Sequence, residues 1–242
     1  MAIVRLNKFI ADAGICSRRK ADERIRSGNV LVNGQPAELG MTIDPTTDEV
    51  TVCGKPVSPQ SEQLVYYALY KPTGVISTAS DPHGRPTVTD LVPSSPRVYP
   101  VGRLDMDSEG LILLTNDGQL AYELMHPSFQ HEKEYEVLVH CPPAGLDRDR
   151  IIATFIKGIE ADGELLQADR VSVDNIRQHQ ENTALLRIVL HTGYNRQIRR
   201  MCEAVGLSVI NLRRVRISRL HLASLSLKAG EYRRIDKSAV LG

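Results

Sequence analysis

Two charged residues stand directly ahead of an apolar segment near the middle of the chain. Arg103 and Asp105 precede the run from Gly110 to Thr115, which ends at the Asn-Asp-Gly sequence 116–118. An apolar run with these boundaries is typical of a buried strand that ends in a turn. In extended chain, residues two apart leave on the same face, so Arg103 and Asp105 would lie together while Leu104 points toward the core. A carboxylate beside a cation can act as an acid, a base or a nucleophile.

Other interpretations of this carboxylate are open. Asp105 alone is also an ordinary turn residue, and Asp107 gives the same loop a second carboxylate. Paired carboxylates are the catalytic arrangement of glycoside hydrolases. A structural turn, one catalytic carboxylate and a carboxylate pair are therefore all compatible with the spacing.

Basic residues gather in two parts of a chain whose formal net charge is +1. Residues 196–219 contain seven arginines and one acid, and the first 28 residues contain seven basic and three acidic residues. Two basic clusters on a near-neutral protein indicate a polyanionic partner such as a nucleic acid. Either cluster alone is equally typical of a solvated helix face.

Length and composition indicate a folded globular protein. With 242 residues, 42% of them hydrophobic and 24% charged, the chain can form one large core, or a core and a small appended domain. It has no run of the roughly 18 apolar residues that a membrane helix needs, and its N-terminus lacks the apolar segment of a signal peptide. We therefore expect a cytoplasmic protein that does not bind a membrane.

The sequence contains no pattern that predicts a metal or a cofactor. The four cysteines lie far apart with no C-x-x-C pair, and the histidines show no metal-ligand spacing. Glycine-rich nucleotide-binding motifs are also missing from the sequence. We expect chemistry that depends on side chains alone.

The first part of the chain predicts a small domain with two helices and a hairpin. Apolar residues at helical spacing predict a helix over 6–13, and Ser17 can cap a second helix that ends at Gly28. Asn33-Gly34 between short apolar runs predicts a hairpin, and a further strand is expected over 49–53. Residues 57–63 are rich in Ser, Pro and Gln, as linkers are. We expect a domain over 1–60 and a second over 61–242, with the boundary near Ser61.

The segments 5–10, 14–22, 28–30 and 32–34 carry a resemblance to a known module. They resemble the S4 domain, an RNA-binding module shared by a ribosomal protein and several RNA-modifying enzymes. The resemblance implies that the basic helix contacts structured RNA through Arg18, Arg19 and Lys20. Such contacts to phosphates position a protein and carry little sequence information.

The remaining chain mixes strands and helices without a regular strand-helix-strand rhythm. Strands are expected over 64–69, 132–140, 164–173, 183–191 and 208–215, and helices over 119–126, 144–156 and 195–205. In the strand over 132–140, Tyr135, Val137 and Val139 alternate with more polar positions. These patterns predict an α+β fold in which helices flank a mixed, mostly antiparallel sheet.

A carboxylate near arginines, in a chain that is expected to bind a polyanion without a metal, favours chemistry on a glycosidic bond of a nucleic acid. Carboxylates can attack or stabilise an anomeric carbon. A base inside structured RNA must first be flipped out, which costs a few kcal/mol. An arginine beside the carboxylate can stack in the gap that the base leaves.

Four segments of the second domain resemble one enzyme family. Residues 102–105 with 108–118 resemble the catalytic motif of the RsuA-type pseudouridine synthases of bacterial ribosomal RNA, Lys133-Glu134-Tyr135 resembles their tyrosine motif, and residues 193–203 their basic motif. Together with Lys71-Pro72-Thr73-Gly74 and the S4-like segment, the resemblance covers most of the chain.

This resemblance implies a role for each matching residue. Asp105 would be the catalytic aspartate, Tyr135 would pack on the target uracil, and Arg199 would be the ionic partner. Arg103 would assist base flipping. Arg196 and Arg200, in the same basic motif, are expected to contact RNA.

The implied function is the isomerisation of one uridine of structured ribosomal RNA to pseudouridine, without a cofactor. Residues 193–201 are nearer to the large-subunit enzymes of the F and B types than to the small-subunit enzyme, so large-subunit rRNA or a pre-ribosomal particle is the expected partner of a monomer. A transfer RNA or small-subunit rRNA substrate remains open, as does a non-catalytic rRNA-binding or assembly protein. A nucleoside or glycoside hydrolase that uses Asp105 and Asp107 is a further alternative.

Overall fold

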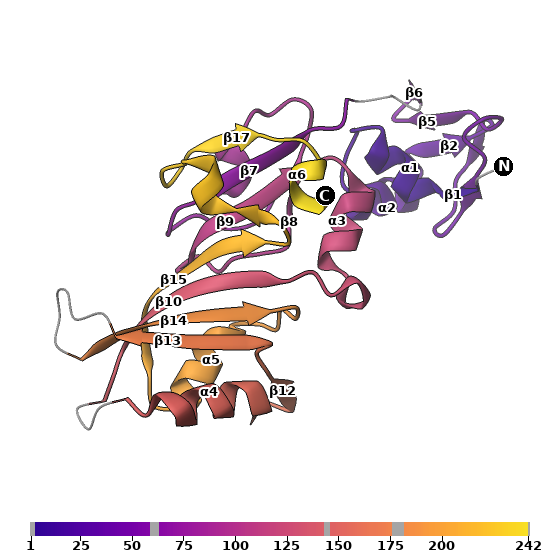
Figure 1. Ribbon diagram of the computed structural model, residues 1–242. Helices are drawn as coiled ribbons and strands as arrows, with labels where there is room; N and C mark the ends of the chain where they lie inside the picture. The colour runs from indigo at the N-terminus through magenta and orange to yellow at the C-terminus, as the bar shows by residue number, and fades with distance from the viewer. Residues whose placement is uncertain (1–2, 59–62, 143–145, 176–181, 242) are drawn as a thin grey trace. The chain divides into compact units, whose positions relative to one another are not determined.

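The computed structural model describes residues 3–58, 63–142, 146–175 and 182–241 (Figure 1). Contacts along the chain divide it into two compact units, Met1–Leu64 with Ser95–Arg97, and Val65–Ser94 with Val98–Gly242. The expected boundary near Ser61 lies outside the described residues. No helix within these ranges is long and apolar enough to cross a membrane.

The first unit combines two short helices with short strands. Its elements are β1 (Val4–Arg5), α1 (Leu6–Asp12), α2 (Arg18–Arg26), β2 (Val30–Val32), β3 (Gln35–Pro36), β4 (Thr42–Ile43), β5 (Val50–Val52) and β6 (Lys55–Val57). Ser17 caps α2 by accepting a hydrogen bond from the backbone NH of Lys20 at 3.2 Å, as predicted. Asn33 and Gly34 join β2 to β3 with φ angles of 51° and 79°, which confirms the hairpin.

The second unit is built on one large sheet. The strand order is β13-β14-β10-β15-β9-β7-β17, with β16 beside β15 and β8 beside β9. The strands are β7 (Tyr66–Lys71), β8 (Tyr99–Val101), β9 (Glu109–Thr115), β10 (Lys133–His140), β13 (Arg170–Asn175), β14 (Thr183–Leu190), β15 (Ser208–Ile217), β16 (Leu220–His221) and β17 (Tyr232–Arg234). Among the described strands, β15 and β9 pair in parallel and the other pairs of this sheet are antiparallel. The expected α+β fold with a mixed, mostly antiparallel sheet is confirmed.

Helices cover parts of this sheet. They are α3 (Gly118–Met125), α4 (Arg148–Lys157), α5 (Gln197–Ala204) and α6 (Ser238–Leu241), with the 3-10 helices η1 (Val88–Leu91), η2 (Pro127–Phe129) and η3 (Leu222–Leu225). α4 packs on β13 and α5 on β15, and Figure 1 shows the two helices together on one side of this part of the sheet. Phe155 of α4 and Met201 of α5 are fully buried there with Val137 and Leu186 of the strands.

One sequence expectation is wrong in this region. Residues 164–173 form two strands in different sheets, because β12 (Glu164–Leu166) pairs with β11 (Ile159–Ala161) and β13 belongs to the large sheet. Between them the backbone NH of Ala168 donates to the carbonyl of Phe155 at 2.9 Å, while Ala168 itself is buried. This contact with α4 turns the chain between the two strands. The start of the helix expected over 144–156 lies partly outside the described residues.

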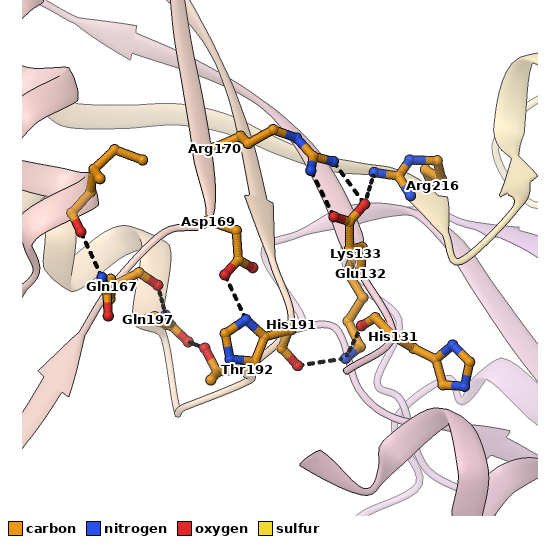
Figure 2. A network of polar contacts seen from close by, with 11 residues as sticks. His131, Glu132, Lys133, Gln167, Asp169, Arg170, His191, Thr192, Gln197 and Arg216 are labelled. Atoms are coloured by element: carbon orange, nitrogen blue, oxygen red, sulfur yellow. Dashed lines mark hydrogen bonds and ion pairs between the residues drawn. The ribbon is translucent and has the colours of Figure 1, made fainter. Parts of the chain in front are cut away.

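Charged side chains pair across strands of the large sheet, and Figure 2 draws the pairs of Glu132 with Arg170 and Arg216. Glu132 binds Arg170 at 2.7 Å and Arg216 at 3.0 Å, and Glu136 binds both Arg213 and Arg187. Two arginines of the basic cluster 196–219, Arg213 and Arg216, are therefore neutralised by carboxylates of the protein itself. The net charge of that segment overstates what it offers to a polyanion.

Candidate active site

Asp105 lies in the loop over residues 102–108, which connects β8 to β9. Leu104 is 7% exposed and belongs to the core that contains Tyr135 and Val137, whereas the side chain of Asp105 is 29% exposed. The alternation that the sequence predicts at these two positions is therefore present. The carboxylate of Asp105 faces solvent from a loop whose neighbouring side chain is fixed in the core.

Hydrogen bonds hold the backbone of this loop at each successive residue. The carbonyl acceptors and their donors are Arg103 with Nη1 of Arg214 (3.4 Å), Leu104 with Oγ of Ser77 (2.7 Å), Asp105 with the NH of Ser108 (3.1 Å), Met106 with the NH of Gly74 (2.8 Å), Asp107 with Nη2 of Arg199 (2.9 Å) and Ser108 with Nζ of Lys71 (2.6 Å). Because five of the six donors come from outside the loop, its shape is set by the surrounding fold. A fixed loop holds a catalytic group in place without further ordering.

The end of the loop depends on a close backbone contact between Gly110 and Arg214. A Cβ at Gly110 would lie 2.3 Å from the carbonyl oxygen of Arg214, and Gly110 has a φ of +109°. Glycine is therefore required where the parallel strands β9 and β15 meet. The side chain of Arg214 is 2% exposed, and its Nε donates to the carbonyl of Leu111 at 2.8 Å. Arg214 thus contacts the backbone on both sides of Asp105, at Arg103 within the loop and at Leu111 beyond it.

Two arginines from the start of α5 reach the carboxylates of the loop. Nη1 of Arg196 lies 3.8 Å from Oδ2 of Asp105, and its Nη2 lies 3.3 Å from Oδ2 of Asp107. Nη2 of Arg199 lies 3.2 Å from Oδ1 of Asp107 and 3.3 Å from Oγ of Ser108. The ion pair recorded for Asp105 among the described residues is therefore with Arg196, whereas the family resemblance pointed to Arg199. Asp107 binds both arginines, and no pattern in the sequence predicted this role.

The buried side chain of Gln197 fixes the start of α5 (Figure 2). Its Oε1 accepts hydrogen bonds from Oγ1 of Thr192 and from the NH of Tyr194, both at 3.1 Å. Its Nε2 donates to the carbonyl of Gln167 at 3.1 Å. Arg196, just before it, has a left-handed φ of 48°. These contacts set where Arg196 and Arg199 point, and a buried glutamine has no sequence pattern that would reveal it.

The other residues predicted to contact RNA differ in how exposed they are and in whether carboxylates already bind them. Arg200 binds Glu164 at 2.6 Å and Asp162 at 3.0 Å, so it ties α5 to the hairpin of β11 and β12 and has little capacity left for RNA. Arg103 is exposed, and no hydrogen bond or ion pair of its guanidinium is recorded within the described ranges. Arg18, Arg19 and Lys20 are exposed along α2 in the first unit.

Tyr135 lies on β10 and is 8% exposed. It pairs in register with Arg214 of β15 and with Ile188 of β14. Through Arg214 the strand of Tyr135 is joined to the carbonyl of Arg103, immediately ahead of Leu104 and Asp105. The structure thus connects the tyrosine strand to the Asp105 loop by one buried side chain.

Two lysines, the buried Lys71 and the half-buried Lys133, lie near these elements. Burial lowers the pKa of Lys71 to about 8, against which the Asp105 carboxylate acts in the opposite direction. Burial, together with the nearby Arg214 cation, also lowers the pKa of Lys133 to about 8. Nζ of Lys71 donates to the carbonyls of Pro72 and Ser108, so this lysine joins the end of β7 to the loop. No group of three or more His, Cys, Asp or Glu that could hold a metal occurs within the described residues.

Comparison with known proteins gives a consistent result for both parts of the chain. Residues 65–204 match the family model of RNA pseudouridylate synthases, and residues 4–50 match that of the S4 domain. The ribosomal large subunit pseudouridine synthase B of Bacillus subtilis is 42% identical over 226 residues, which cover 91% of this chain and 88% of that protein. The dual-specificity RNA pseudouridine synthase RluF of Escherichia coli is 43% identical over 231 residues, covering 95% of this chain and 74% of that protein.

A solved structure agrees with these relatives. The crystal structure of a pseudouridylate synthase superposes with a TM-score of 0.65 at 28% identity, covering 97% of each chain. The chain therefore belongs to the RNA pseudouridylate synthase family and is an RNA pseudouridine synthase with an S4 domain.

Proposed function

We propose that this enzyme isomerises one uridine of structured large-subunit ribosomal RNA to pseudouridine, with Asp105 as the catalytic carboxylate. The observation that carries the proposal is the position of Asp105 on a loop with every carbonyl from Arg103 to Ser108 hydrogen-bonded. The name of the Bacillus subtilis relative, a ribosomal large subunit pseudouridine synthase, supplies the substrate class, and the name of the Escherichia coli relative adds only that it acts on RNA with dual specificity. Large-subunit rRNA, free or in a pre-ribosomal particle, is the proposed partner of a cytoplasmic monomer.

The reaction is balanced without a cofactor. The bond between N1 of uracil and C1′ of ribose breaks, the detached ring turns, and C5 bonds to C1′. The proton on C5 is lost and N1 gains one, so no atoms or electrons are added overall. A carboxylate can attack C1′ or accept a sugar proton, and either step uses the ionised form of Asp105.

The surrounding side chains support separate parts of this task. Arg196 places a cation 3.8 Å from the Asp105 carboxylate, and this ion pair helps to fix where the carboxylate points. We assign Tyr135 to packing against the detached uracil, and Arg199 to holding the loop through Asp107. The exposed Arg103 is free to stack in the gap left by the flipped uridine. Asp107 binds two arginines, so it is less suited to serve as the second carboxylate of a hydrolase.

Substitution of Asp105 tests the proposal. Asp105→Asn should bind rRNA nearly as well as wild type and form no pseudouridine, because the amide cannot act as a nucleophile or a base. The matched variant Asp107→Asn should retain turnover at a reduced rate. Pseudouridines are mapped by sequencing rRNA from cells that lack the enzyme and are complemented with each variant.

Three outcomes would contradict the proposal. Turnover by Asp105→Asn would remove this residue from the mechanism. Wild-type protein that binds rRNA but forms no pseudouridine in it would indicate a different substrate or an assembly role. Free uracil released into solution would indicate a hydrolase.

A further inference from the structure

A group of exposed aromatic side chains lies at the C-terminal end of α3 and in η2. We call Tyr122, Met125, His126 and Phe129, together with the half-buried His131 that follows η2, the aromatic patch. The ring of Tyr122 lies 4.9 Å from that of His126 and 5.9 Å from that of Phe129, and Phe129 and His131 are parallel within 9° at 6.3 Å. Tyr122 is 50% exposed, Met125 49% and Phe129 46%. A contiguous set of exposed apolar side chains is typical of an interaction site.

The backbone around the aromatic patch is ordered by local contacts. Nδ1 of His126 lies 2.8 Å from Oγ of Ser128, and Pro127 begins η2. Gln130 ends η2 with a left-handed φ of 51°. The rings therefore have defined positions while their faces stay exposed, which lowers the entropy lost when a flat partner stacks on them.

The aromatic patch is joined to the Asp105 loop. The NH of Gly102 donates to Sδ of Met125 at 3.1 Å. Gly102 is three residues ahead of Asp105, and three residues of extended chain span at most about 11 Å. The aromatic patch therefore begins within the length of one or two nucleotides of the proposed catalytic carboxylate.

A second connection runs to the strand of Tyr135. Nζ of the half-buried Lys133 lies 3.4 Å from the carbonyl of His131, a contact drawn in Figure 2. Lys133 and Tyr135 are two residues apart on β10, so they leave the same face of the strand about 7 Å apart. The aromatic patch thus adjoins both segments that carry the proposed catalytic residues.

We propose that the aromatic patch is a binding site for unpaired nucleotides of the substrate RNA that flank the target uridine. Exposed rings bind bases by stacking, which tolerates any base and suits single-stranded nucleotides. Arg103, next to Gly102, supplies an exposed cation for the backbone of the same nucleotides. An RNA occupant is favoured over a protein because the patch continues directly into the site of an RNA enzyme. The inference rests on the proposed function for the position of that site.

The lack of tryptophan in the chain allows a direct binding test. Phe129→Trp makes the one tryptophan of the protein, and its fluorescence should be quenched to saturation by a short single-stranded oligouridylate that stacks on it. Tyr232→Trp is the matched control, because Tyr232 is 42% exposed, lies edge-on to Tyr67 at 5.4 Å and sits on the edge strand β17, outside the aromatic patch. Quenching that is absent, or equal at the two positions, would overturn the proposal.

Kinetics test whether the aromatic patch acts on the substrate. Tyr122→Ala and Phe129→Ala should each raise KM for an rRNA fragment between about fivefold and about 150-fold, with kcat nearly unchanged, because each stacked base contributes about that factor. Tyr232→Ala should leave both constants unchanged. An unchanged KM in both patch variants would overturn the proposal and leave a protein as the occupant.

The two measurements separate this inference from the proposed function. The titration needs no turnover, so position-specific quenching in a protein that forms no pseudouridine in rRNA would refute the proposed function alone. Normal turnover without quenching would refute the aromatic patch alone.

Discussion

The Asp105 carboxylate lies against the guanidinium of Arg196, with Oδ2 and Nη1 3.8 Å apart, while Arg199 is held by Asp107 at 3.2 Å. The two arginines therefore have different surroundings, although both come from the start of α5. Arg196 is 47% exposed at its side chain and Arg199 14%. The exposure of each arginine and the number of its contacts decide how much it contributes to catalysis.

Replacing the two arginines should give losses of different size. Arg196→Gln removes an exposed pair that solvent screens, worth roughly 1 kcal/mol, so kcat/KM should fall about fivefold. Arg199→Gln removes charge-assisted hydrogen bonds to Asp107 and Ser108 from a mostly buried group, so a loss of about 30-fold or more is expected. Arg233→Gln, at an exposed arginine of β17, is the control. Steady-state kinetics on an rRNA fragment check the order, and a larger loss for Arg196→Gln would contradict it.

Gly110→Ala should destabilise the second unit strongly. The added Cβ would meet the Arg214 backbone at 2.3 Å in a left-handed conformation, and strain of this kind costs about 3 kcal/mol or more. Gly193→Ala is the control, since nothing lies within 4 Å of its added Cβ. Urea denaturation measures both free energies of unfolding. If Gly110→Ala lowers the free energy of unfolding by less than about 1 kcal/mol, the backbones of β9 and β15 can move apart at little cost, which would contradict the prediction.

Ser77→Ala should slow the reaction more than it weakens RNA binding. Oγ of Ser77 donates to the carbonyl of Leu104 at 2.7 Å and accepts from its NH at 3.0 Å, so the variant frees the residue before Asp105. The loss is about 1–3 kcal/mol, or about five- to 150-fold in kcat. Ser224→Ala, which removes a hydroxyl bonded to the carbonyl of His221, should leave kcat unchanged. Hydrogen exchange at residues 102–108 should accelerate in Ser77→Ala alone, and unchanged exchange would rule out the loop as the cause.

As pH rises, the free energy of unfolding of the wild type should increase relative to that of the Lys71→Met variant. The pKa of Lys71 is lowered from 10.5 to about 8 in the folded protein, chiefly by burial. Below pH 8 both states are protonated and the cost of the buried charge is fully present. Between pH 8 and 10.5 the folded state has lost this proton while the unfolded state keeps it, so wild type gains about 2 kcal/mol by about pH 9.5. Denaturation across this range measures the difference.

The controls for this pH effect are within the chain. Lys133 has a similarly lowered pKa, but it is present in both proteins and cancels from the comparison. Lys228→Met, at an exposed lysine, should follow the wild-type profile. A parallel profile for Lys71→Met would show that Lys71 does not release its proton in this range.

Removing two charges from α2 should weaken the salt dependence of RNA binding. Arg18 and Arg19 are exposed, and each phosphate contact contributes about 0.7–0.9 to the slope of log K against log salt concentration. The double alanine variant should therefore lower the slope by about 1.4–1.8. Arg233 and Arg234, another exposed consecutive pair, provide the matched control. Titrations of an rRNA fragment at several salt concentrations measure the slopes, and equal slopes would exclude α2 from RNA docking.

Local patterns in the sequence predicted much of the fold. The cap at Ser17, the hairpin at Asn33-Gly34 and the alternation along β10 each depend on neighbours in the chain, and all three are confirmed. The family was also identified correctly, because its motifs are short continuous segments. Features that depend only on neighbouring residues can therefore be predicted from the sequence alone.

The details of the site depend on contacts between distant segments. The donors that hold the loop, such as Lys71, Ser77 and Arg214, come from three strands or loops that no periodicity brings together. The helix predicted from residue 195 begins at Gln197, because Arg196 adopts a left-handed conformation. That conformation is uncommon in residues other than glycine, and no sequence pattern predicts it at an arginine. It places Arg196 beside Asp105, which the sequence did not predict.

The hydrogen bonds that hold residues 103–108 have a consequence for the choice of uridine. A loop that is already fixed has little conformational energy to release when RNA binds, so the free energy of extruding the base must come from new contacts and from the RNA itself. Uridines in loops and weakly paired junctions cost the least to extrude. The selectivity of the enzyme among uridines therefore depends in large part on how readily each site in the RNA opens.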